Sequence, residues 1–232
     1  MTGVTKARFT QITATPAEPT KERYMNRKSV FFACAAVALA VPAIAQVAMP
    51  GSALPGAPEA ARVMPGSYKV DANHTQVVWT LNHMGITPLS GDFAASGGSL
   101  NLDPAHPEAA TVTVDFNLAT MTTLVPAFTT HLLSADILDA VKYPTANFTS
   151  TGVKVSGAMA KITGNLTLHG VTKPVVLDAR FYGAGDNPRS KKLNIGFSAT
   201  TTIKRSDFGI MYGPTVADQV NLEIHAAFEK AA

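Results

Sequence analysis

Apolar and polar residues alternate with a period of two along much of the chain from residue 68 onward. In the segment 111–118, the apolar members of the alternation are Val112, Val114, Phe116 and Leu118. The same alternation recurs in residues 175–182, 193–199 and 220–228. One apolar and one polar face is typical of antiparallel strands. Because Gly, Asn and Pro turns separate these short segments, the pattern predicts a mainly β domain, either a sandwich or a barrel.

One segment, residues 126–144, departs from this alternation. Its apolar residues lie at helical spacing and are Phe128, Leu132, Leu133, Ile137, Leu138 and Val141. Pro126 suits a first helical turn, and Pro144 forbids continuation of a helix. We therefore expect a helix pair or a broken helix that caps one end of the strands. Ser134 is interpreted as a helix cap with two carboxylates near the helix N-terminus.

The first part of the chain divides into three segments ahead of the expected domain, 67–232. Residues 25–45 have a basic start, an apolar run too short to span a membrane, and a small-x-small pattern before Gln46. These features are typical of a cleaved secretory signal peptide. Residues 1–24 are interpreted as a misassigned upstream start, with an unusually long signal n-region as the alternative. Residues 46–66 are rich in Pro, Ala and Gly, which predicts an extended linker.

The basic character of the chain comes from these N-terminal segments. Six of the 19 Lys and Arg residues and two of the 16 Asp and Glu residues precede Gln46, which leaves 13 basic and 14 acidic residues. Nearly balanced charge without a clustered basic face argues against nucleic-acid binding. The single cysteine, Cys34, lies in the signal segment, so disulfide and thiol chemistry are not expected in the mature domain.

The stretch GNLTLHGVTKPVVLDARFYG places a histidine beside a glycine between two alternating segments. Leu168 ends one expected strand and Val175 begins the next, so residues 169–174 should form the connection. Its glycine permits a turn, and its proline fixes the entry to the following strand. Because no nucleophile lies nearby in the sequence, His169 is interpreted as a turn residue and not as a catalytic group.

Five motifs follow one another in the chain: YKVDANHTQVVWTLNHMG, GDFAASGGSL, HLLSADILDAVKYPTANFTST, NLTLHGVTKPV and IKRSDFGI. In this order they resemble the YceI-like proteins, a bacterial periplasmic polyisoprenoid-binding family, across residues 67–230. Each motif alone is weak, but five in order are specific. Two positions depart from the family pattern, since Trp79 stands where Phe is usual and Ile137 replaces a common aromatic residue.

The resemblance implies an extended, lipocalin-like antiparallel β-barrel of about eight strands with a short helical cap. It also implies that an isoprenoid quinone, a polyprenyl phosphate or another long-chain lipid lies along the barrel axis, for carriage or storage, without a further cofactor. The residues expected at the lipid tail are Trp79, Leu81, Phe93, Phe116, Phe128, Leu132, Leu177, Phe181, Ile195, Phe197 and Phe208. The residues expected at its head group are His74, His83 and Arg205.

The signal segment and the resemblance together predict a protein exported to the periplasm that binds a ligand and is not an enzyme. Its expected partner is the lipid, with transient contact to the membrane that supplies it. The oligomeric state stays open, with a dimer as one option.

Two alternatives also remain. The first is a periplasmic enzyme that acts on a lipid or an amide with His83 or His131 as the base. The second is a ligand-free β-sandwich with a packed core, used for interaction. The histidines form no close pair of metal-ligand spacing, so no metal site is predicted. Arg205 and Asp207 are expected to pair across a turn, with Phe208 packed beneath them.

Overall fold

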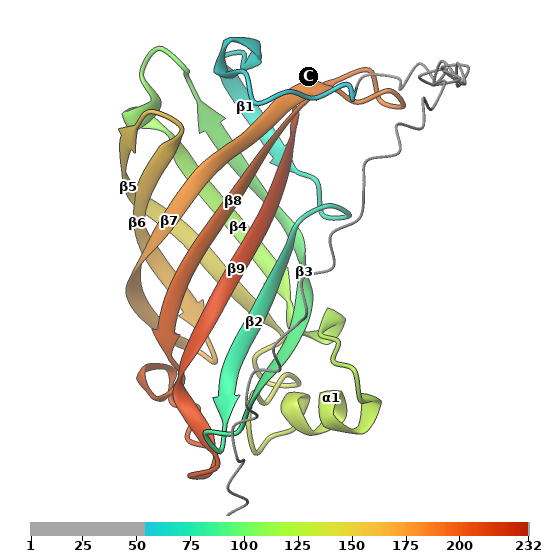
Figure 1. The fold of residues 1–232 in the computed structure, drawn as a ribbon, viewed down its shortest axis with the longest axis vertical. Coiled ribbons are helices and arrows are strands. Elements are labelled where there is room, and N and C mark those ends of the chain that lie inside the picture. The colour runs from blue at the N-terminus through green and yellow to red at the C-terminus, as the bar shows by residue number, and fades with distance from the viewer. Residues whose placement is uncertain (1–53, 232) are drawn as a thin grey trace, which may run out of the picture. The chain divides into compact units, whose positions relative to one another are not determined.

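The computed structural model describes residues 54–231, which form one antiparallel sheet that closes on itself (Figure 1). The strands are β1 (Gly66–Val70), β2 (Gln76–His83), β3 (Thr87–Leu102), β4 (Thr111–Asn117), β5 (Thr145–Ser156), β6 (Met159–Leu168), β7 (Val171–Asp186), β8 (Leu193–Lys204) and β9 (Val216–Lys230). Their order in the sheet is β1-β3-β2-β9-β8-β7-β6-β5-β4, and β3 pairs with β4 to complete the circle. The prediction of a mainly β barrel is confirmed.

The barrel wall has eight strand positions because β1 and β2 share one of them. Both strands pair with β3 on one side and with β9 on the other. A bend at residues 71–75 separates them, and buried Thr75 holds this bend against β9 through hydrogen bonds to the Ala227 backbone. Closure pairs each of the eight strand positions with a neighbour on both sides, although the first half of β3 and the second half of β5 pair on one side only.

The connections between strands lie at two ends of the barrel. One end, called the helical end below, carries the connections 84–86, 118–144, 169–170 and 205–215. The opposite end carries the connections 103–110, 157–158 and 187–192. Figure 1 shows helix α1 (Pro126–Leu133) at the helical end, beside the starts of β3 and β5.

Glycines mark most of the places where the strands bend. The pairing register shifts immediately before Gly97 in β3, Gly152 in β5 and Gly183 in β7, and once more between Leu81 and His83 in β2. Such bulges increase the local twist of a strand and help a sheet to coil into a barrel.

Helix α1 is shorter than the helical spacing predicted, because the chain leaves helical geometry at Ser134. Ser134 ends the helix instead of starting one, so its interpretation as an N-terminal cap was wrong; its Oγ donates to the His131 carbonyl at 2.7 Å. The following apolar residues, Ile137 and Leu138, are buried in turns. Within residues 54–231, no helix is long and apolar enough to cross a membrane.

The core has two parts. The larger cluster occupies the body of the barrel and includes Tyr68, Leu118 and Ile195, which are almost completely buried. A second cluster at the helical end contains Leu138, Phe208 and residues of β6 and β8. Both clusters draw on the inward residues of the strands, as the alternating pattern predicted.

The connection between β6 and β7 is a turn of two residues, His169 and Gly170, both with positive φ (51° and 74°). Two such residues are the usual geometry of a tight hairpin turn. The expected connection through residue 174 was too long, since Pro174 lies inside β7 opposite Asn165. His169 Nδ1 lies 3.1 Å from the Phe208 carbonyl, and its ring packs against Tyr143, which agrees with a turn role.

The chain ahead of β1 packs against the barrel from residue 55 onward. Ala57 exchanges two backbone hydrogen bonds with Ala184 of β7, and a 3-10 helix (Ala60–Arg62) leads to buried Val63. The expectation of an extended linker as far as residue 66 is therefore corrected for residues 55–66. Gly183 and Gly185 make room for this segment, because a side chain at either position would meet its backbone. The expected upstream start, the signal segment and residues 46–53 lie outside the described residues.

Candidate functional site: an apolar cavity along the barrel

A cavity of about 440 Å³ runs along the inside of the barrel. Strands β2 to β9 all contribute inward side chains to its wall, and α1 contributes Phe128 and Leu132. It extends from Ala60 and Val63 at the opposite end to Tyr212 at the helical end. Its volume lies within the usual range for small-molecule sites, about 300–1,000 Å³.

Small inward residues keep this space open. Ala179 and Ala199 lie opposite each other on β7 and β8, and Ala226 of β9 lies opposite Phe197. Beside them, the rings of Phe181 and Phe197 pack edge to face with centroids 5.8 Å apart. The expected mixture of large and small inward residues is therefore present, and it forms an elongated space with aromatic walls.

Almost the whole cavity wall is apolar. Among the described residues that line it, five carry a side-chain nitrogen or oxygen: Trp79, Thr111, Thr201, Arg205 and Tyr212. Trp79 is buried, and its indole Nε1 has no hydrogen-bond partner within residues 54–231. A buried N–H without a partner costs about 1–3 kcal/mol. Because protein atoms enclose this nitrogen, it offers no hydrogen bond to the open cavity.

Nine of the eleven side chains expected at a lipid tail lie in the cavity wall, namely Trp79, Leu81, Phe93, Phe116, Phe128, Leu132, Leu177, Phe181 and Phe197. The other two are outside it. Ile195 is 1% exposed and belongs to the same buried core cluster as Tyr68 and Phe228. Phe208 is equally buried and packs with Leu138 and Ile210 beneath the connection that follows β8.

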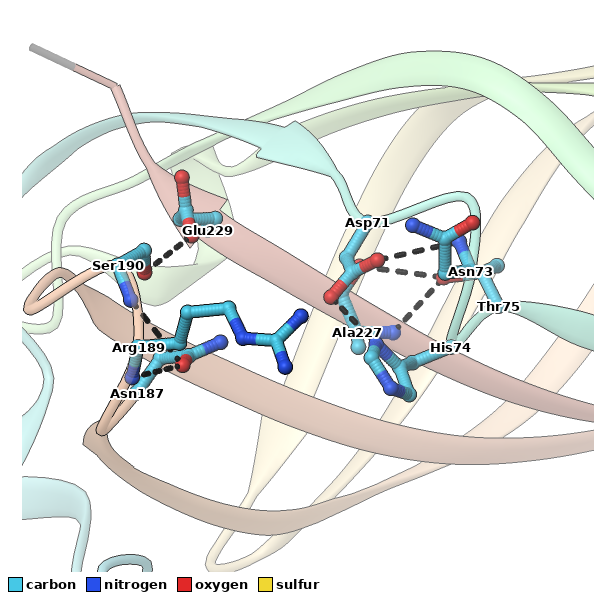
Figure 2. A network of polar contacts seen from close by, with 9 residues as sticks. All are labelled: Asp71, Asn73, His74, Thr75, Asn187, Arg189, Ser190, Ala227 and Glu229. Carbon is cyan, nitrogen blue, oxygen red and sulfur yellow. Dashed lines mark hydrogen bonds and ion pairs between the residues drawn. The ribbon is translucent and has the colours of Figure 1, made fainter.

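The three residues expected at a head group do not come together. His74 lies in the bend between β1 and β2, exposed on the outside, with Nδ1 2.7 Å from the Asp71 carboxylate (Figure 2). His83 ends β2 at the helical end and is not part of the cavity wall. Only Arg205 lines the cavity. His74 and His83 therefore lie away from the cavity wall, and of the three only Arg205 is positioned to meet a ligand inside it.

Arg205 holds together the connection between β8 and β9. Its guanidinium donates to four backbone carbonyls, those of Ile210 (2.7 Å), Val216 (3.1 Å), Ala217 (3.1 Å) and Gly213 (3.3 Å). The expected pair with Asp207 does not form, because these carbonyls occupy the guanidinium. Carbonyl partners carry no net charge, so Arg205 still places a positive charge at the helical end of the cavity.

A carboxylate on the next strand supports the same connection. Asp218 accepts hydrogen bonds from the Ser206 amide (2.9 Å) and hydroxyl (2.8 Å). Three effects chiefly hold the pKa of the Asp218 carboxyl below its ordinary value. In order of size they are the hydrogen bond from the Ser206 amide, the hydrogen bond from the Ser206 hydroxyl and the nearby charge of Arg205. These contacts fix the turn that carries Arg205 and Phe208.

His131, one of the two histidines considered as bases, has a structural partner. His131 of α1 shares a hydrogen bond of 2.9 Å between Nε2 and the Tyr212 hydroxyl, and their rings pack edge to face. This contact joins the helix to the β8–β9 connection, which sequence reasoning missed because the two residues are far apart in the chain. Among the described residues, no group of three or more His, Cys, Asp and Glu side chains could hold a metal ion.

Comparison with known proteins places this fold and cavity in a family context. The chain is 40% identical over 168 residues to a UPF0312 protein of Pseudomonas putida (strain W619), covering 71% of this chain and 87% of that protein. It is 38% identical over 169 residues to a UPF0312 protein of Pseudomonas fluorescens (strain SBW25), covering 71% and 87% of the two chains.

Solved structures share the architecture. A YCEI protein of Campylobacter jejuni matches with a TM-score of 0.55 and 32% identity, over 65% of this chain and 90% of that one. A polyisoprenoid binding domain from Saccharophagus degradans matches with a TM-score of 0.51 over 71% and 98% of the two chains, but its 15% identity shows the fold alone. The model of the YceI-like domain matches residues 68–228, and the chain therefore belongs to the YceI-like family.

Proposed function

We propose that this protein is an exported lipid-binding protein that holds a polyisoprenoid-type ligand, either an isoprenoid quinone or a polyprenyl phosphate, for carriage or storage. The observation that carries the proposal is the continuous cavity of about 440 Å³ with an almost wholly apolar wall. Such a wall suits a long hydrocarbon chain and offers few hydrogen bonds to a polar ligand. The polyisoprenoid binding domain with the same fold supports this ligand class.

Within this proposal, the nine expected side chains in the wall contact the tail. Arg205 and Tyr212 are the polar groups nearest the helical end of the cavity, and they replace the dispersed histidines as head-group contacts. The cationic Arg205 favours an acceptor oxygen, which both a quinone and a phosphate supply.

Energetics favours exchange over permanent capture. Burial of a CH₂ group contributes about 0.8 kcal/mol relative to water, so a tail of ~40 carbons would gain roughly 30 kcal/mol. That exceeds the largest affinities known, about 18–21 kcal/mol, so water is the wrong reference state. A lipid taken from a membrane leaves one hydrocarbon environment for another, and the net free energy of transfer is small. Binding without turnover, in the periplasm, fits this exchange and the expected signal segment.

The decisive experiment is to purify the protein from a periplasmic extract without detergent, extract it with organic solvent and analyse the extract by mass spectrometry. We expect an isoprenoid lipid at close to stoichiometric amount. A well-folded protein whose extract contains no lipid would contradict the proposal. Recovery of the protein from the cytoplasmic fraction alone would contradict export.

A further inference from the structure

Large apolar side chains are exposed at the helical end of the barrel. Leu124 and Val141 are 97% and 95% exposed, and Met84, Ile86, Val125 and Met211 are also exposed. These six residues come from three separate connections, 84–86, 118–144 and 205–215. They therefore do not form one flat face, and each connection presents its own apolar side chains to solvent.

Among the described residues, the connections at the opposite end carry no exposed large apolar side chain themselves, although Val155 and Met159 beside the 157–158 turn, and Leu54 and Met64 ahead of β1, are exposed. These connections contain Asp103, Glu108, Arg189, Lys191 and Lys192 instead. Figure 2 shows part of this polar region, where Asn187 accepts hydrogen bonds from the backbone of Arg189 and Ser190, and Ser190 bonds Glu229. Exposed large apolar side chains are therefore more numerous at the helical end than at the opposite end, and among the described residues only the connections at the helical end carry them.

The exposed apolar end is continuous with the cavity. Tyr212 lies next to exposed Met211, is itself partly exposed, and lines the cavity. Its hydroxyl contacts His131 of α1, and the same helix contributes Phe128 and Leu132 to the cavity wall. A lipid that leaves the cavity past Tyr212 would therefore emerge among the exposed apolar residues.

We propose that the helical end docks on a lipid bilayer, with Ile86, Leu124, Val141 and Met211 inserted among the lipids. The connections at this end carry two cations, Lys142 and Arg205, against three carboxylates, Asp136, Asp139 and Asp207. This near-neutral balance points to attraction by apolar burial and not by charge. Apolar side chains on separate loops suit a fluid bilayer better than the rigid, complementary surface of a protein partner. The inference rests on the proposed function, since a bilayer is the source of the lipid.

The test is flotation with phosphatidylcholine vesicles. It uses the mature protein, purified from the cells that naturally produce it. We expect the wild type to float, and to float equally at about 0.1 M and about 1 M salt, because apolar burial is not screened. The double variant Leu124→Asp/Val141→Asp should lose about tenfold or more in vesicle affinity, since two charged groups would enter the apolar layer. Tyr182→Asp is the matched control, because Tyr182 is an exposed apolar residue on β7, away from these connections.

A wild-type protein that stays off the vesicles would overturn the docking proposal, as would a double variant that floats as well as the wild type. Loss of flotation only at high salt would show that charge, and not apolar burial, holds the protein on the bilayer. That result would also contradict the docking proposal. Mass spectrometry of the same preparations keeps the two proposals apart. A protein that floats but carries no isoprenoid would contradict the proposed cargo and leave the docking surface standing.

Discussion

Ala179 of β7 and Ala199 of β8 lie directly opposite each other on neighbouring strands, both buried and both in the wall of the cavity. Two methyl groups at adjoining positions occupy much less space than the leucine or phenylalanine side chains common in barrel interiors. The pair therefore sets the width of the cavity at this level.

We expect Ala199→Phe to abolish lipid binding, because the added ring would occupy the space beside Ala179. Overpacking of this kind costs about 1–3 kcal/mol of stability, which leaves most domains folded. Mass spectrometry of a solvent extract measures the bound lipid, and thermal unfolding measures the fold. Thr200→Phe is the control, because Thr200 is the next residue and lies exposed on the outer face. A folded Ala199→Phe variant with the wild-type amount of lipid would show that the ligand does not lie here.

Trp79 should act on the ligand by packing and not by hydrogen bonding. Its ring lines the cavity, but its Nε1 is enclosed by protein atoms and does not face the open space. We therefore expect Trp79→Phe to weaken binding of an isoprenoid quinone and of an isoprenoid hydrocarbon of equal length by the same factor. Mass spectrometry of solvent extracts measures both ligands, because the variant lacks the chain's single tryptophan and cannot be followed by tryptophan fluorescence. A larger loss for the quinone would show that a ligand oxygen reaches the indole.

The strands could be predicted from the sequence because alternation is a local signal. Val114 and Phe116, for example, were placed on one inner face by spacing alone, and both are buried. Closure of the barrel by β3 and β4 depends on long-range pairing, which has no local signal. The packed N-terminal segment was missed for a similar reason. Its Pro, Ala and Gly content is the same in a free linker and in a segment held by Ala184.

The apolar residues of the cavity wall could be predicted from the sequence, but the contacts of its polar groups could not. Alternation placed Leu177 and Phe181 correctly, because inward direction follows from position in a strand. Ile195 is also a buried core residue, but it lies outside the cavity wall. The role of Arg205 was out of reach, because its four carbonyl partners are identified by the path of a loop and not by residue type.

Gly170 should be far less tolerant of substitution than a comparable turn glycine. A Cβ at Gly170 would lie 2.5 Å from Cε1 of Tyr143, and the backbone has a φ of 74°. Gly157, between β5 and β6, also has a positive φ, but nothing lies within 4 Å of its added Cβ. We expect Gly157→Ala to cost about 1–2 kcal/mol from conformation alone, and Gly170→Ala about 1–3 kcal/mol more from the clash. Urea unfolding measures both, and equal costs would show that Tyr143 moves aside freely.

Arg205→Lys should loosen the connection between β8 and β9. A lysine ammonium is a compact donor and cannot reach four carbonyls that a planar guanidinium spans. Because these bonds come from a charged group and are partly buried, we expect a loss of about 2–4 kcal/mol in the free energy of unfolding. Arg180→Lys, at an exposed position of β7, should change it by less than about 0.5 kcal/mol. If the two variants unfolded at the same urea concentration, the carbonyl contacts would not stabilise the fold.

Asp218 should make part of the stability depend on pH. The Ser206 hydrogen bonds lower the pKa of the Asp218 carboxyl in the folded protein below its ordinary value of 3.8. A lowered folded pKa means that the ionised carboxylate stabilises the fold above the unfolded pKa, and that this contribution is lost as the pH falls through the folded pKa. Asp218→Asn keeps an acceptor for the Ser206 amide but removes the charge. We therefore expect the variant to be less stable than the wild type at pH near 7, with the difference shrinking below pH about 4. Urea unfolding at both pH values measures this difference, and a difference that stays constant with pH would mean that the carboxylate charge has no part in holding the turn.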